Sequence, residues 1–119
     1  MSVDLSHLQN LDGFMGAALV DSDTGRIIAQ AGQANFDLDA AAMGNAEVIK
    51  VKRQAMLRMG MEEVIEDILI TLTHQYHLIR TLDFDPSLFV YLVLDRHRGE
   101  LGMARNRIRK FEKCLELFP

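Results

Sequence analysis

The sequence predicts a layered α/β domain, mainly from two neighbouring patterns near its end. Residues 88–94 are wholly apolar and stop at Asp95, which is typical of a strand that is buried on both faces. After this strand, apolar residues recur at alternating steps of three and four, which places them on one face of a helix. These residues are Leu101, Ala104, Ile108, Phe111, Leu115 and Phe118. A length of 119 residues suits one domain, at 1–119.

Eight elements are expected along the chain. They are a helix at 4–11, strands at 14–20 and 26–31, a helix from Asp37 to about Met59, strands at 64–72, 75–82 and 88–94, and the C-terminal helix. The spacing of Leu5, Leu8 and Leu11 predicts the first helix. The next two strands flank a turn at 21–25, where aspartates can accept backbone hydrogen bonds and Gly25 can adopt a positive φ.

The long helix is expected to begin with Asp37 as its N-cap and to stop at Gly60. Its apolar surface is wider than one stripe, because Val51 and Leu57 fall outside the sector of its other apolar residues. Methionines make this region deformable, and such a surface serves either as core or as an adaptable contact. They are Met43, Met56, Met59 and Met61.

The composition indicates a globular chain, since 49% of its residues are hydrophobic. No run approaches the roughly 18 apolar residues of a membrane span. The N-terminus lacks the basic start and apolar block of a secretory signal. We therefore expect a cytoplasmic protein. Cys114 is the only cysteine, and on the last helix we expect it to be a small buried or half-buried apolar residue.

The net charge of −4 is unevenly distributed. Residues 1–48 carry seven acids and a single basic residue, Arg26. Residues 96–113 carry only Glu100 and Glu112 as acids, against the basic residues Arg96, Arg98, Arg105, Arg107, Arg109, Lys110 and Lys113. This pattern has two interpretations, either ordinary solvated faces or a basic helix face that docks an acidic partner. Nucleic acid is not expected, because no aromatic residues are interleaved with the basic ones.

Residue patterns for catalysis are not evident. There is no glycine-rich phosphate loop and no C-x-x-C pair. His74 and His77 have an odd spacing, which on a strand would point them to opposite faces and away from a shared metal. Asp21 and Asp23 are explained by the turn. We therefore expect no enzyme activity, no cofactor and no metal.

Two motifs resemble the roadblock/dynein light chain (MglB-like) domain family. Residues 16–29, GAALVDSDTGRIIA, resemble the first hairpin of that family. Residues 89–95, FVYLVLD, followed by ELGMAR at 100–105, are similar to its last strand and to the L-G-x-A-R start of its last helix. The element order agrees over nearly the whole chain. The resemblance implies a profilin-like fold with an antiparallel sheet in the order 2-1-5-4-3, the long helix on one face and the terminal helices on the other.

In that fold the third strand is an edge, and its part at 68–72 has no charge and no proline, which is an aggregation hazard if exposed. The resemblance implies a homodimer in which third strands pair and long helices pack together. The candidate dimer residues are Val48, Ile49, Lys52, Met56, Ile68, Ile70 and Leu72.

The resemblance also implies a non-catalytic regulator or scaffold of a small Ras-like GTPase, in some family members an activating partner. Such a regulator acts by reshaping the switch loops of the GTPase. Two alternatives remain open: a structural adaptor in a larger complex, like a dynein light chain, whose binding ignores nucleotide state, and a small-molecule sensor.

Overall fold

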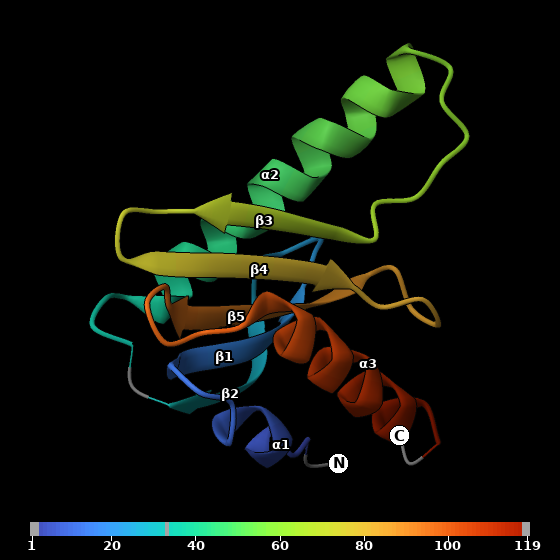
Figure 1. Cartoon of the computed structure of the whole chain (residues 1–119). Coiled ribbons are helices and arrows are strands. Elements are labelled where there is room, and N and C mark those ends of the chain that lie inside the picture. Colours follow the sequence, from blue (N-terminus) through green and yellow to red (C-terminus); the bar gives the residue numbers. More distant parts are fainter. Residues whose placement is uncertain (1–2, 33, 118–119) are drawn as a thin grey trace.

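The computed structural model describes residues 3–32 and 34–117, so Phe118 of the predicted helical face lies outside the described residues. Its elements are α1 (Ser6–Gln9), β1 (Phe14–Asp21), β2 (Ile27–Gly32), α2 (Leu38–Arg58), β3 (Asp67–Thr71), β4 (Gln75–Thr81), β5 (Leu88–Asp95) and α3 (Leu101–Leu117). The five strands form one antiparallel sheet in the order β2-β1-β5-β4-β3 (Figure 1). This arrangement confirms the predicted fold class.

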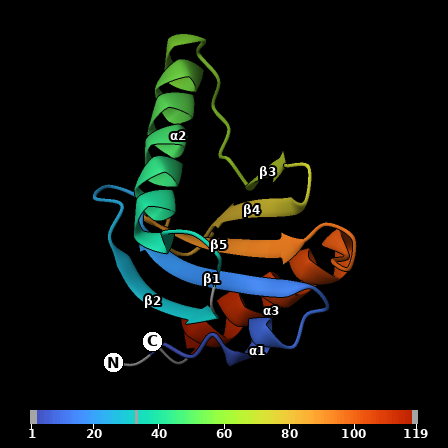
Figure 2. The ribbon, with the colours of Figure 1, turned by 90° about the vertical axis from the view of Figure 1, so that its left-hand side faces the viewer.

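The sheet separates two layers of helices. Helix α2 lies on one face, and α1 and α3 lie on the other (Figure 2). Strand β5 is central, and its residues alternate between the two cores: Leu92 packs in the core beneath α1 and α3, whereas Tyr91 and Val93 pack in the core beneath α2. The two-sided apolarity of this strand is therefore explained by its place in the middle of the sheet.

Local sequence signals account for the ends of α2 and for the first hairpin. The Asp37 side chain accepts a hydrogen bond from the backbone N–H of Ala40 at 3.1 Å, as an N-cap does. Gly60 follows the helix with φ +69°, a conformation that costs glycine little. In the β1–β2 turn, Asp21 Oδ1 accepts a hydrogen bond from the backbone N–H of Asp23 at 2.8 Å, and Gly25 has φ +76°.

The start of α3 is capped by Glu100, whose carboxylate accepts hydrogen bonds from the backbone N–H groups of Gly102 at 2.8 Å and Met103 at 3.0 Å. The predicted apolar face is directed into the core. Ala104, Ile108 and Phe111 are buried, and Leu115 packs against the same cluster. The expectation for Cys114 was wrong, because this residue is exposed. Its position on the helix turns the thiol away from the sheet.

The first helix and the third strand are shorter than expected. Leu5, Leu8 and Leu11 are all buried, yet only Ser6–Gln9 is helical. Strand β3 begins at Asp67, because the register pairs Asp67 with Arg80 and the chain before it leaves the sheet to reach the end of α2. Val64, which was expected in this strand, lies in that connection and is 79% exposed.

None of the helices in the described part of the chain is long and apolar enough to cross a membrane.

Candidate functional site: an apolar surface at the β3 edge

Strand β3 forms one edge of the sheet and pairs only with β4 among the described strands. Its free side therefore presents backbone N–H and C=O groups that no described strand satisfies, which is a template for pairing with another chain. The side chains alternate. Ile68 and Ile70 are half-buried and pack against the core beneath α2, whereas Leu69 packs against the core beneath α1 and α3. The strand carries no proline, and its one charged residue, Asp67, stands at its start.

Helix α2 passes beyond this edge. Figures 1 and 2 show that its C-terminal half projects past the sheet and that a long connection returns from its end to β3. The buried residues of α2 reflect this geometry, because Met56 is the only one of them after Ile49. Leu57, in the projecting half, is 77% exposed. A helix that buries its apolar side against its own sheet would not leave such residues in water.

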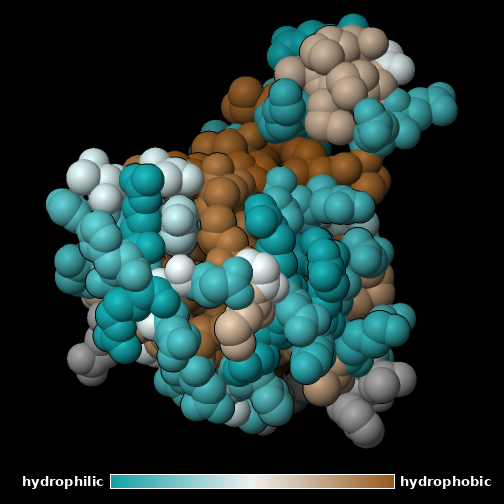
Figure 3. Space-filling view, in the orientation of Figure 1, coloured by the Kyte–Doolittle hydropathy of each residue, from teal (hydrophilic) through white to brown (hydrophobic). Residues whose placement is uncertain are grey.

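Apolar side chains gather around this projection. The space-filling view shows them between the end of α2 and β3 (Figure 3). The exposed large apolar residues of α2 and its connection are Met43, Val48, Val51, Leu57, Met59, Met61 and Val64. We call the free edge of β3, together with Val48, Val51, Leu57, Met59, Met61 and Val64, the edge surface. Exposed apolar groups gathered in one region of a small domain mark an interaction site.

The seven predicted dimer residues fall into three groups. Val48 and Lys52 are exposed on α2, and Leu72 is exposed directly after β3. Ile68 and Ile70 are half-buried, so part of each side chain remains accessible. Ile49 and Met56 are buried within the subunit.

The burial of Ile49 corrects its assignment to the surface. Its side chain is fully buried in the core between α2 and the sheet, where Ile68 and Ile70 also pack, so it stabilises the subunit and is not available to a second copy. The edge surface also contains exposed apolar residues that are absent from the sequence-based set, namely Val51, Leu57, Met59, Met61 and Val64. The available signal was the position of Val51 and Leu57 outside the main apolar sector of the helix.

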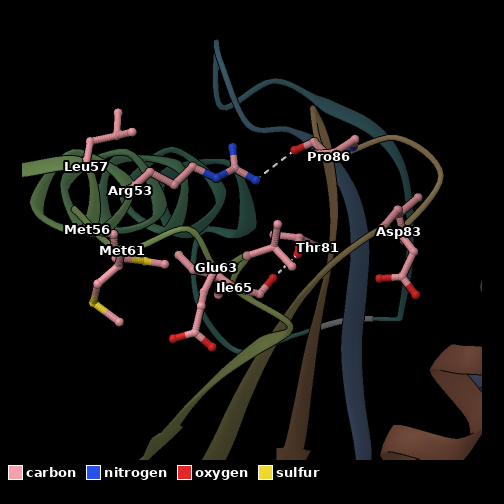
Figure 4. A pocket seen from close by; sticks show the side chains of 11 residues that line it. Arg53, Met56, Leu57, Met61, Glu63, Ile65, Thr81, Asp83 and Pro86 are labelled. Atoms are coloured by element: carbon pink, nitrogen blue, oxygen red, sulfur yellow. Dashed lines mark hydrogen bonds between the residues drawn. The ribbon is translucent and has the colours of Figure 1, made fainter. Parts of the chain in front are cut away.

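A pocket of about 300 Å³ lies beside the edge surface, between the C-terminal half of α2, its connection to β3 and the β4–β5 loop (Figure 4). Much of its lining is apolar, including Met56, Ile65 and Leu82. Its polar groups are partly satisfied by the protein itself. Arg53 Nη2 donates a hydrogen bond to the Pro86 carbonyl at 2.9 Å, and the Thr81 hydroxyl donates to the carbonyl of Ile65.

The core beneath α2 contains a polar network around His77. The Tyr91 hydroxyl lies 2.9 Å from His77 Nδ1, and His77 Nε2 lies 2.8 Å from Gln75 Oε1. The Phe36 ring stacks on the imidazole with a centroid distance of 5.6 Å. Burial lowers the pKa of His77, because the charged imidazolium would lose water. Burial also raises the pKa of Tyr91 to about 12, while a hydrogen bond with Asn45 acts in the opposite direction.

A second buried polar pair lies on the opposite face of the sheet. Arg80 Nε is 3.8 Å from Glu112 Oε1, and both side chains are more than nine-tenths buried. The other carboxylate oxygen of Glu112 accepts a hydrogen bond from the backbone N–H of Asp83 at 3.2 Å. Burial raises the pKa of Glu112 above its ordinary value, with smaller opposing contributions from the Asp83 bond and from Arg80. Nearby, Arg105 Nε donates to Asp67 Oδ2 at 3.1 Å and ties α3 to the start of β3.

The histidines and acids considered in the sequence do not form a catalytic group. His74 is exposed beside His97, whereas His77 points into the core beneath α2. Asp21 serves the β1–β2 turn. Across the described residues, no cluster of three or more His, Cys, Asp or Glu side chains is arranged to hold a metal ion.

Comparison with known proteins identifies solved structures that share this architecture. No family model matches the chain, and no curated protein matches it significantly in sequence. Solved structures do match. A Roadblock/LC7 domain from Streptomyces avermitilis has a TM-score of 0.81 at 14% identity, over 95% of this chain and 91% of that one.

Two MglB structures are also similar. Myxococcus xanthus MglB has a TM-score of 0.72 at 21% identity, over 86% of this chain and 80% of that one. The gliding protein MglB from Thermus thermophilus has a TM-score of 0.75 at 16% identity, over 93% of this chain and 82% of that one. The chain therefore has the roadblock/LC7 fold, of the kind seen in MglB.

Proposed function

We propose that this chain is a homodimeric, non-catalytic regulator or scaffold of a small Ras-like GTPase. The observation that carries the proposal is the edge surface, where the unpaired strand β3 lies beside the exposed apolar half of α2. The family resemblance of the β1–β2 hairpin and of the β5–α3 segment supplies the class of partner. The similar structures of MglB, one of which has a tetrameric arrangement, support assembly of this fold into oligomers.

A second copy satisfies both parts of the edge surface at once. Pairing of β3 with its symmetry mate hydrogen-bonds the free edge of each sheet. The projecting half of α2 then packs against the neighbouring subunit, which removes part of its exposed apolar surface from water. Each fully buried aliphatic side chain of this kind contributes roughly 1.5–3 kcal/mol by transfer from water.

Regulation by such a dimer requires no catalytic residue of its own. The dimer would stabilise one conformation of the GTPase switch loops and so shift the population toward the competent state. This mechanism agrees with a chain whose polar groups Tyr91 and Arg80 are buried and whose His77 is half-buried against Tyr91. We propose that the protein acts in the cytoplasm, where such GTPases are found.

The dimer is tested by light scattering coupled to gel filtration at micromolar concentration. A mass near twice 13.5 kDa is expected. A monomer across the accessible concentration range would contradict the proposal at its first step.

The partner is tested by affinity capture from the native cell extract, once with a non-hydrolysable GTP analogue and once with GDP. Enrichment of a Ras-like GTPase with the analogue alone supports the regulator. Equal recovery in both nucleotide states supports a passive scaffold or an adaptor subunit.

The sensor alternative has one observation in its favour, the pocket of about 300 Å³ beside α2. Arg53 and Thr81 of this pocket each already donate a hydrogen bond to a main-chain carbonyl, which leaves fewer donors to fix a ligand. The pocket also adjoins Leu57 and Met61 of the edge surface, and we therefore assign it to the dimer contact.

A further inference from the structure

We propose that the outer face of α3 binds an acidic peptide segment of a partner protein. The residues that would make the contact are Arg107, Arg109, Lys110 and Lys113, which we call the cationic face. It lies on the opposite side of the sheet from α2 (Figures 1 and 2), so the proposed dimer leaves it open. The inference is thus independent of the proposed function.

None of the four cations of this face forms an ion pair with a described residue. The ion pairs of the described residues involve Arg80 and Arg105 as their cations, and none involves the cationic face. Arg107 Nη1 donates a hydrogen bond to the carbonyl of His7 at 2.7 Å, which orients the guanidinium and leaves its charge unpaired. Like charges three or four residues apart on a helix repel one another. A bound anion would reduce this repulsion between the cations.

The acids of α3 form no ion pair with this face. Glu112 turns inward to Arg80 and is buried. Glu100 uses its carboxylate to cap the first turn of the helix. Glu116 is the exposed acid on this half of the helix and lies toward the side that holds Arg80 and Asp83. The helix dipole does not explain the cations either, because none of them stands in the last turn.

The surface is also hollowed. A shallow depression of about 640 Å³ is lined by His7, Arg107, Arg109, Lys110, Lys113 and Cys114. No carboxylate is among these residues. The adjoining depression is also lined by Arg109 and Lys113, together with Arg80 and the acids Asp83, Glu112 and Glu116, and therefore has mixed charge. Basic side chains are thus concentrated over the side of α3 that faces α1, although the whole chain is acidic, with a net charge of −4.

The dimensions and lining favour a peptide over other anions. Residues 107–113 span roughly 9 Å at the rise of an α-helix, which matches a short segment with two or three carboxylates. The lining has no Phe, Tyr or Trp side chain on which bases could stack. It also has no large apolar side chain that could insert into a lipid bilayer.

The test measures binding of a fluorescent peptide of alternating Glu and Gly by anisotropy, with a Gln–Gly peptide of equal length as the control ligand. The Glu peptide is expected to bind more tightly, and its affinity is expected to fall as salt is raised. Arg109→Glu with Lys113→Glu should weaken binding by roughly tenfold or more, because each substitution replaces an attraction with a repulsion.

The matched control is Arg26→Glu with Arg98→Glu, which changes the net charge equally on exposed residues outside the depression. These substitutions should leave binding within about threefold of the parent, since only screened long-range charge changes. Equal losses in the two double variants would show a general charge effect and overturn the site.

Cys114 gives a readout at the site itself, because it is the only cysteine of the chain and lines the depression. Bound Glu peptide should slow its reaction with a thiol reagent, and the Gln peptide should not. Unchanged reactivity at saturating peptide would place the binding elsewhere. Tighter binding of anionic vesicles or of single-stranded RNA than of the Glu peptide would likewise overturn a peptide site.

Discussion

The Tyr91 hydroxyl lies 2.9 Å from Nδ1 of His77, in the core between the sheet and α2. His77 Nε2 also lies 2.8 Å from Gln75 Oε1, an acceptor. Both bonds are satisfied when the imidazole is neutral, with its proton on Nε2 and Nδ1 accepting from the phenol. The neutral imidazole with its proton on Nε2 therefore satisfies both contacts, and burial lowers the pKa of His77, which favours this neutral form.

A dependence of stability on pH follows from this arrangement. Burial lowers the pKa of His77 below 6.5, so below pH 6.5 the unfolded chain binds more protons than the folded one. The contribution of neutral His77 to stability is therefore present above pH 6.5 and is lost as the pH falls toward the folded pKa. Denaturant unfolding between pH 5 and 8 should show a smaller slope against pH for His77→Gln than for the parent. The exposed His74 supplies the control variant His74→Gln, which should retain the parent slope.

Substitution of Ile70 by Lys is expected to weaken the proposed dimer. Ile70 lies in the edge strand with its side chain half-buried, so a lysine there places charge at the pairing surface. Ile28→Lys is the matched control, because Ile28 is exposed on β2, the other edge of the sheet. Sedimentation equilibrium of both folded variants, checked by thermal melting, measures the effect. Equal association of the two variants would remove β3 from the interface.

Truncation of Phe111 tests the core between α3 and the sheet. Phe111 is buried with Ile108 and Ala104, and Phe111→Ala should lower the free energy of unfolding by about 3–5 kcal/mol. Cys114→Ala, three residues later on the exposed side of the same helix, should change it by less than about 0.5 kcal/mol. Urea unfolding of both variants gives the two values, and similar values would contradict the orientation of the helix.

Removal of one member of the Arg80–Glu112 pair should lower the free energy of unfolding by more than apolar replacement of both members. Glu112→Ala leaves the guanidinium without its buried carboxylate, and a loss on the order of 3 kcal/mol is expected. Arg80→Met combined with Glu112→Leu fills the same volume with apolar groups and should lie within about 1 kcal/mol of the parent. A double-mutant cycle by urea unfolding, with Arg80→Met and Glu112→Leu measured singly and together, gives the coupling. Additive losses would mean that the two side chains stabilise the fold independently.

Much of the fold could be predicted because its signals are local. The periodicity of Ala104, Ile108 and Phe111 identified the buried side of α3, and Asp37 and Gly60 marked the ends of α2. The apolar run of β5 predicted a strand covered on both faces. Such patterns depend on hydrogen bonds and side-chain directions within a few residues, and these recur wherever the same spacing occurs.

The candidate site was less predictable, because exposure depends on what lies opposite a residue. Ile49 and Val48 are neighbours in sequence and both apolar, yet one is enclosed by the sheet and the other faces solvent. Val64 is a β-branched residue of the kind favoured in strands, but it lies in the connection that leaves the sheet. The length of α2 relative to the sheet decides which of its apolar residues remain exposed.

The sequence by itself determined the order of the elements, the two ends of α2 and the apolar side of α3, since these follow from local periodicity and turn chemistry. Only the tertiary structure decided that α2 projects beyond the edge of the sheet, that Cys114 is exposed, and that Glu112 turns inward to Arg80 while the neighbouring cations remain outside. The reason is physical: periodicity shows which side of an element is apolar, whereas the arrangement of the other elements determines how much of that side is covered.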